Sequence, residues 1–247
     1  MRTCIFCDNK ASTGEDAWPK WLMKRFPASN TSYMDAERGG RKLGSWPMAK
    51  PKLLVNWLCA KCNNGWMSRI ESKTKPVIES ILDDKLSVIN SSSQSMLACW
   101  AVKTSMVLEC LNPNRTWFYT DDERQLMCVT QTFPPRTSVW IAKCVEQPNI
   151  YSAAKDLRTS IDDAGVHAYA TTMAFGSLAF QVVSIKTPGT IPENVSITYD
   201  VTEGPWDKTL LQVWPIIQEP LKWPANYGLN SELGLAALTE RLSSKGR

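Results

Sequence analysis

The chain has 247 residues, of which 43% are hydrophobic and 21% are charged, and its formal net charge is +4. This ordinary apolar content predicts a normal hydrophobic core, in one large domain or in a small domain plus a larger one. No stretch approaches the roughly eighteen uninterrupted apolar residues of a membrane span, and the first residues lack the apolar core of a signal peptide. We therefore expect a cytoplasmic protein that has no membrane partner.

The charge is unevenly distributed along the chain. Residues 1–75 contain 14 lysines and arginines against 6 aspartates and glutamates, a net charge of +8, whereas residues 76–247 contain 14 against 18, a net charge of −4. A basic N-terminal part on a mildly acidic remainder is typical of a protein that contacts nucleic acid with one end. Chance clustering on a solvated surface explains the charge alone equally well.

Two pairs of cysteines, Cys4/Cys7 and Cys59/Cys62, have the spacing of metal ligands. Two thiolates two residues apart can face the same ion, and two such pairs complete a tetrahedral zinc site. In a reducing compartment these pairs are ligands rather than disulfides. The other four cysteines are isolated in apolar surroundings, where a free thiol behaves as a small hydrophobe, and we assign no role to Cys99, Cys110, Cys128 and Cys144.

The predicted elements change from short and loop-separated to longer helices and strands along the chain. The N-terminal third predicts a helix over 19–26, a loop over 28–50, a strand over 53–58, a helix from 62 to about 75 and a second helix over 75–86. The remainder predicts a break at 91–93, an amphipathic helix over 95–111, a helix over 121–130, a strand over 138–142, a hairpin of 166–175 and 178–185, strands over 195–201 and 210–214, and a helix over 231–242 with Ser231 as its N-cap.

This order predicts an α+β protein. Residues 1–76 would form a zinc-stapled treble clef, because a cysteine knuckle is followed by a helix that carries the second pair. Residues 77–247 would form a larger body of helices and antiparallel sheet.

The residues around the cysteines carry a further pattern. The run Glu15-Asp16-Ala17-Trp18-Pro19 follows the first pair, and Asn63-Asn64-Gly65-Trp66 follows the second. These segments resemble the zinc-stapled members of the HNH endonuclease superfamily of bacterial and phage proteins, over roughly residues 1–76. The resemblance implies a ββα-metal module and a role in phage or bacterial defence.

The resemblance also implies a catalytic site. Glu15 and Asn63 match the residues that hold a divalent ion, Mg²⁺ or Mn²⁺, at the scissile phosphate. Asn56 matches the residue that orients the general base. Asp16 stands where the family has its histidine base, and an ordinary aspartate is a poor proton acceptor at neutral pH.

Three interpretations of Glu15 and Asp16 remain open. The site is a relic that keeps the fold for binding, or the two carboxylates hold a divalent ion that activates water without a histidine. In the third interpretation, the pair favours the N-terminus of the short helix that follows. The one histidine, His167, is expected in a distant strand as a structural residue.

The expected partner is nucleic acid, most simply DNA, although a protein partner bound by residues 77–247 is the alternative from another class. Eight basic residues of the module are candidates for phosphate contacts: Lys20, Lys24, Arg25, Arg38, Arg41, Lys42, Lys61 and Arg69. Five tryptophans can stack on bases, but most should pack around the zinc core: Trp18, Trp21, Trp46, Trp57 and Trp66.

Overall fold

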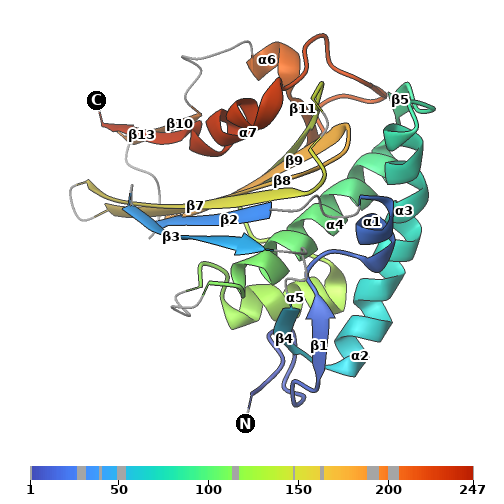
Figure 1. Cartoon of the computed structure of the whole chain (residues 1–247). Coiled ribbons are helices and arrows are strands. Elements are labelled where there is room, and N and C mark those ends of the chain that lie inside the picture. The colour runs from blue at the N-terminus through green and yellow to red at the C-terminus, as the bar shows by residue number, and fades with distance from the viewer. Residues whose placement is uncertain are drawn as a thin grey trace.

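A seven-stranded sheet forms the centre of the computed structural model, with helices on both of its faces (Figure 1). The structure describes residues 2–26, 32–38, 41–48, 54–112, 117–146, 148–161, 164–187, 195–199 and 206–246. The strands follow the order β11-β6-β9-β8-β7-β2-β3. Their bounds are β11 (Leu211–Trp214), β6 (Thr137–Lys143), β9 (Leu178–Lys186), β8 (Ala164–Phe175), β7 (Tyr151–Ile161), β2 (Ser32–Arg38) and β3 (Arg41–Met48).

The hairpin of β8 and β9 confirms the prediction made around Gly176-Ser177. Phe175 pairs with Leu178, so two residues connect the strands. Gly176 has φ = 53°, and a Cβ built there would lie 2.5 Å from the ring of Phe26. Two features therefore disfavour a side chain at position 176. The backbone is left-handed there, and the aromatic ring of Phe26 packs on the turn.

The predicted loop over 28–50 is wrong, because this segment contributes β2 and β3 to the sheet. β2 and β3 pair antiparallel, from Ser32 opposite Met48 to Arg38 opposite Arg41. Pro47 lies in β3, the last strand in the order of the sheet, and an edge strand is where a sheet tolerates proline. β2 runs parallel to β7, a long strand that the sequence pattern did not predict.

One helix, α3 (Ser68–Leu82), replaces the two helices predicted to meet at Pro76. A proline inside a helix removes one hydrogen bond and costs about 3 kcal/mol. The helix continues because its buried face spans the proline on both sides, with Ile70, Thr74, Ile78 and Ile81 all turned inward. Burial of such side chains contributes about 1.5–3 kcal/mol each, which outweighs the lost bond.

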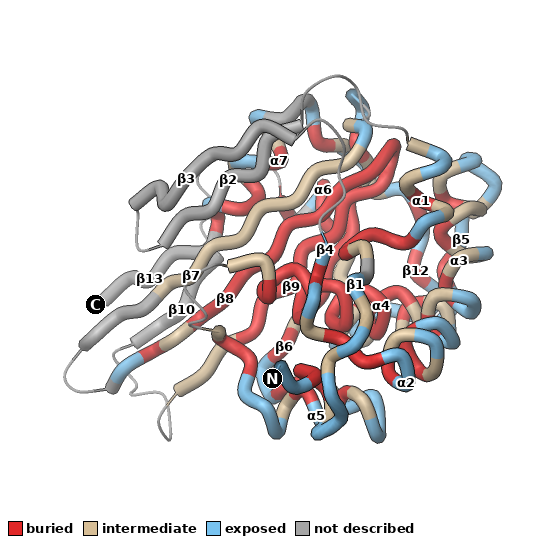
Figure 2. The backbone as a smooth tube through the Cα atoms, turned by 60° about the horizontal axis from the view of Figure 1, so that its bottom comes forward, coloured by how far each residue is buried: buried red, intermediate tan, exposed pale blue. Residues whose placement is uncertain are grey.

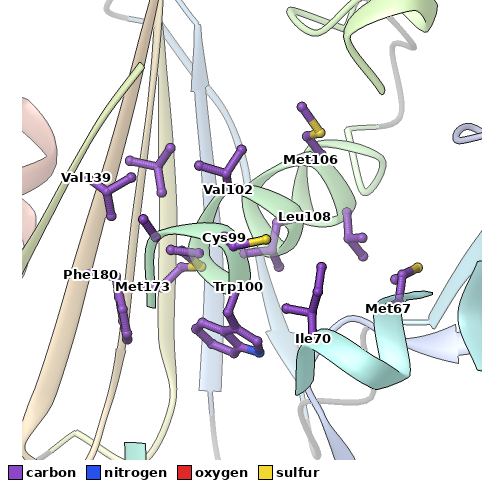
Figure 3. Close-up of a cluster of buried hydrophobic side chains, with 14 of the residues drawn as sticks. Met67, Ile70, Cys99, Trp100, Val102, Met106, Leu108, Val139, Met173 and Phe180 are labelled. Carbon is purple, nitrogen blue, oxygen red and sulfur yellow. The ribbon is translucent and has the colours of Figure 1, made fainter. Parts of the chain in front are cut away.

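The helix α4 (Ser91–Glu109) is buried on nearly every face, so the prediction of an amphipathic helix is wrong. Its first residue lies in the predicted break, because the Asn90 side chain accepts a hydrogen bond from the Ser93 N–H at 2.8 Å and caps the helix. α4 packs between the sheet and α3, with Trp100 lying 5.3 Å from Phe180 of β9 (Figure 3). Figure 2 shows most of β8 and β9 and much of α4 in the colour of buried residues.

The remaining elements surround this core. α5 (Asp121–Thr130) matches its prediction and begins with a capping box between Thr120 and Glu123. α7 (Ser231–Glu240) packs on β7 and β8 from the other face of the sheet, and its N-cap is Asn230 rather than the predicted Ser231. Smaller elements are β5 (Val88–Ile89), paired with β12 (Leu221–Lys222), β10 (Val195–Tyr199), paired with β13 (Leu242–Gly246), and α6 (Trp206–Thr209).

The mixed fold of helices and mainly antiparallel strands agrees with the predicted α+β class. The predicted units 1–76 and 77–247 share the seven-stranded sheet, and one apolar cluster extends from Cys4 to Trp223. α3 also crosses the proposed boundary. The division into these two units stays a prediction, and the unfolding experiment in the Discussion addresses it.

Candidate metal centre

Four cysteine sulfurs meet at the N-terminal end of the molecule. The Sγ atoms of Cys4, Cys7, Cys59 and Cys62 all lie within 4.8 Å of one another, and none is in a disulfide. Two of these separations are 3.6 Å, between Cys7 and Cys59, and 3.5 Å, between Cys7 and Cys62. A tetrahedral zinc ion with bonds of about 2.3 Å places its sulfurs about 3.8 Å apart. The quartet therefore fits a metal ion such as zinc.

The second cysteine pair is positioned by a strand and a helix start. β1 (Thr13–Asp16) and β4 (Leu54–Leu58) form an antiparallel pair, and α2 (Ala60–Cys62) begins two residues after β4. The Cys59 sulfur accepts a hydrogen bond from the Cys62 N–H and so caps α2. A π-helical turn (Asn63–Met67) kinked at Gly65 then leads into α3.

The first cysteine pair lies in a turn that is fastened to β4. The N–H of Ile5 donates to the Trp57 carbonyl at 3.0 Å, and the Thr13 hydroxyl donates to the Leu58 carbonyl at 2.9 Å. Phe6 is fully buried against the edge of Trp66, with ring centroids 4.9 Å apart. These contacts hold the first cysteine turn and β1 against β4 and the start of the helix, segments that are distant in the sequence.

The thiols of the quartet titrate differently. Burial raises the pKa of the Cys4 thiol to about 11, and burial also raises the pKa of Cys62. Burial acts in the same direction on Cys7, but hydrogen bonds from the Asn9 backbone and from neighbouring side chains outweigh it and lower that pKa to about 7. Because metal ligands must be thiolates, an incoming ion displaces protons from Cys4 and Cys62.

A fifth thiol lies beside the quartet. The Cys128 Sγ is 3.9 Å from the Cys62 Sγ, although Cys128 comes from α5 and we predicted no role for it. Sequence offers no signal for this residue, since it is a single cysteine with no partner at metal-ligand spacing. Cys99, Cys110 and Cys144 are buried elsewhere in the fold, as expected for small apolar side chains.

The residues of the predicted catalytic site lie on the same strands and helix start. Glu15 pairs with Val55 and Asp16 with Leu54 across β1 and β4; the Glu15 side chain is outside the described part of the structure. Asn56 is exposed, and its Oδ1 would lie 2.9 Å from a Cβ built on Gly14 of β1.

Asn63 and the Asp16 carboxylate complete the set of catalytic candidates. Asn63 follows the quartet directly, and its N–H donates to the Cys59 carbonyl at 3.0 Å. The Asp16 Oδ1 is buried and has no hydrogen-bond partner within the described structure.

The predicted basic contacts fall on several elements. Lys20, Lys24 and Arg25 lie on α1 (Lys20–Arg25), and Lys61 and Arg69 lie on α2 and α3; all five are exposed. Arg25 is bonded to Asp83 at 2.5 Å, so it already has an anionic partner. Arg38, Arg41 and Lys42 lie on β2 and β3, with side chains outside the described structure.

The tryptophans divide between core and surface. Trp18 and Trp66 are buried, which confirms their expected packing role, and Trp21 is half-buried; the Trp46 side chain is not described. Trp57 meets Trp117 edge-on at 5.3 Å in the wall of a pocket of about 410 Å³ next to the first cysteine turn. Arg2 lies over the Trp57 ring at 5.1 Å.

His167 lies in β8, far along the chain from the cysteines, as predicted. Its Nε2 is 2.8 Å from the Asp156 Oδ1 on the neighbouring strand β7, and its ring packs edge-on against Phe118 at 4.7 Å. Within the described chain, the cysteine quartet is the one group of three or more histidine, cysteine or acidic residues close enough to share an ion.

Comparison with known proteins identifies no relative that indicates a function. No family model matches the chain, and no curated protein matches it. A solved structure of full-length peroxisomal multifunctional enzyme type 2 from Drosophila melanogaster aligns with 13% identity and a TM-score of 0.18. The alignment covers 45% of this chain and 24% of that one, and a likeness at this level carries no functional weight. None of the described helices combines the length and apolar character needed to cross a membrane.

Proposed function

We propose that this chain is a nucleic-acid-binding protein with an HNH-like module, in which a structural zinc ion staples a treble clef and the nuclease site is degenerate. The observation that carries the proposal is the cysteine quartet, which joins an antiparallel strand pair to the start of a helix. Two strands followed by a helix, with a metal at the joint, is the arrangement that the resemblance to ββα-metal nucleases implies.

The chemistry supports binding more strongly than cleavage. A general base in phosphodiester hydrolysis must accept a proton from water near neutral pH, which imidazole does and an ordinary carboxylate does poorly. By the resemblance, Asp16 occupies the position of that base. His167 is hydrogen-bonded to Asp156 on the central sheet. The exposed lysines and arginines of α1, α2 and α3 remain as phosphate contacts.

A salt titration of duplex DNA binding tests this function. Each phosphate contact contributes about −0.9 to the slope of log K against log salt concentration. The double variant Lys61→Gln/Arg69→Gln should bind more weakly and lower that slope by about 1–2. Lys222→Gln, on β12 in the acidic part of the chain, is the control and should leave the slope unchanged. Absence of binding even at low salt would favour the protein-interaction alternative.

An active metal-dependent endonuclease is the second candidate, and the Asp16 Oδ1 favours it. That buried oxygen has no partner among the described residues, and a Mg²⁺ or Mn²⁺ ion would supply one. Glu15 and Asn63 are the neighbouring positions that the resemblance assigns to the same ion.

Plasmid cleavage with Mg²⁺ or Mn²⁺ separates the two candidates. The degenerate site predicts that the natural chain is inert and that Asp16→His, which restores an imidazole base, cuts the plasmid. Cutting by the natural chain that is lost in Asp16→Ala, but kept in the surface control Asp122→Asn, would establish the enzyme instead.

A further inference from the structure

The metal centre has one thiol more than a tetrahedral ion uses. Cys128 Sγ lies 3.9 Å from Cys62 Sγ, which is comparable with the separations inside the quartet. A structural zinc site is closed by four ligands. The fifth thiol therefore stays outside the coordination sphere while remaining within reach of a ligand sulfur.

The fifth thiol is also the more accessible partner of the pair. Cys128 and Cys7 are half-buried, whereas Cys4, Cys59 and Cys62 are buried. Cys7 would be bound to the metal, which reduces its reactivity toward oxidants. Cys128 lies on the C-terminal half of α5, and Figure 1 shows α5 next to β4, the strand that precedes Cys59.

We propose that Cys128 and Cys62 form a peroxide-responsive thiol pair, whose disulfide expels the metal ion and loosens the N-terminal module. This inference rests on the metal centre of the proposed function, but not on nucleic-acid binding. It gives the centre a regulatory chemistry in addition to its structural one.

The reaction consumes one hydroperoxide and two thiols. The Cys128 thiol loses its proton as its sulfur attacks the outer oxygen of the hydroperoxide; an S–O bond forms, the O–O bond breaks, and the oxygen that leaves takes up a proton to become water or an alcohol. The Cys62 thiolate then leaves the metal and attacks the Cys128 sulfur; the S–S bond forms and the S–O bond breaks, releasing hydroxide that is protonated to water. Two electrons pass from the two sulfurs to the peroxide.

The loss of Cys62 leaves the ion with three thiolates. Metal affinity in such sites depends on the full ligand set and is coupled to folding, so the ion dissociates into a competing chelator. A disulfide is reducible, so dithiothreitol with added zinc should restore the closed centre.

The experiment uses the full-length protein loaded with zinc. Metal content is measured first, and hydrogen peroxide is then added in the presence of a chromogenic chelator that reports released zinc. Peptide mapping by mass spectrometry without reduction identifies the linked cysteines at each time point. We expect a peptide joining Cys62 to Cys128 to appear in step with the release of the ion, and both changes to reverse on reduction with added zinc.

Cys128→Ala is the decisive variant, because it keeps all four ligands. It should bind zinc like the natural chain, lose the linked peptide and release zinc more slowly under peroxide. Cys144→Ala, which removes a buried thiol from a separate apolar cluster, is the matched control and should behave like the natural chain.

Three results would overturn the proposal. Equal release rates in Cys128→Ala and the natural chain would show that Cys128 takes no part. Disulfides within the quartet alone, without Cys128, would show the same. Absence of zinc before peroxide would remove the metal centre itself, and this outcome is distinguished from the other two by the first measurement.

Discussion

At the residue scale, the metal centre depends on side chains that contribute more than one contact. Cys59 donates a sulfur to the quartet, caps α2 by accepting the Cys62 N–H, and lies 3.6 Å from the Cys7 sulfur. A hydroxyl in its place keeps the cap but is a poor zinc ligand, since zinc sites of this kind are built from thiolates. Replacing Cys59 with serine therefore tests metal binding while the cap of α2 is kept.

Cys59→Ser should bind less than one zinc ion per chain and melt at a lower temperature. Metal binding and folding are coupled in such centres, and each kcal/mol of lost stability lowers Tm by about 2–4 °C in a chain of this size, so we expect a fall of more than about 5 °C. Elemental analysis and thermal melts measure both effects. Cys144→Ser is the control for metal content, and unchanged metal and Tm in Cys59→Ser would show that the ion is not structural.

At the element scale, helices α4 and α5 are joined by a buried ion pair. Arg124 of α5 is fully buried and lies 2.5 Å from the Glu109 carboxylate at the end of α4, and it also donates to the Met106 carbonyl at 3.0 Å. The Glu109 carboxylate accepts hydrogen bonds from the N–H groups of Phe118 and Tyr119. This network fixes the position of α5, and with it the position of Cys128 beside the quartet.

Arg124→Leu should destabilise the chain by about 3–5 kcal/mol, because it leaves a buried carboxyl without its cation. Burial raises the pKa of Glu109 to about 7, and Arg124 partly offsets that rise. An acid with a raised folded-state pKa contributes stability at low pH that is lost as the pH rises through that pKa. Removing Arg124 raises the pKa further, so the variant should lose more stability at pH 8 than at pH 6.

Urea unfolding at the two pH values measures this difference. In the Glu109→Gln background the carboxyl is absent, so the further loss caused by Arg124→Leu should be nearly equal at both pH values. An equal loss in the single variant would show that Glu109 does not titrate in this range.

At the scale of the whole molecule, the basic N-terminal segment is integrated into the fold. β2 and β3 extend the central sheet beyond β7, α3 packs along α4, and Trp18 lies against Phe175 at the β8–β9 turn. One apolar cluster includes the quartet cysteines, α4 and the sheet strands. Shared core surface of this kind couples the unfolding of its parts.

We therefore expect a single unfolding transition for the full chain, and we expect zinc removal by a chelator to shift that transition as a whole. Circular dichroism reports the sheet and helices, and differential scanning calorimetry tests whether the calorimetric and van 't Hoff enthalpies agree. Two transitions, of which only one moves on chelation, would support independent folding of residues 1–76 instead.

The predictable parts of the fold and the site are those encoded in short stretches of chain. The hairpin around Gly176, the capped helix α5 and the two cysteine pairs each depend on residues a few positions apart, and the structure has all three. Local helix propensity predicts a boundary at Pro76. The helix α3 continues past this proline because its side chains are buried against α4, which a local pattern does not record. β2 and β3 were missed for a related reason, since their place is set by pairing with β7.

The four cysteines of the candidate metal centre could be predicted from the sequence, because a spacing of two residues lets the paired thiols face one ion once the loop between the pairs closes. The assignment of Asp16 to the position of a histidine base rests on the resemblance of residues 1–76 to HNH endonucleases and stays a proposal. The position of Cys128 beside the quartet could not be predicted, and neither could a buried Asp16 Oδ1 without a partner among the described residues, because both depend on the packing of elements distant in sequence. Local patterns record which chemistry is available, whereas long-range burial decides which side chains meet.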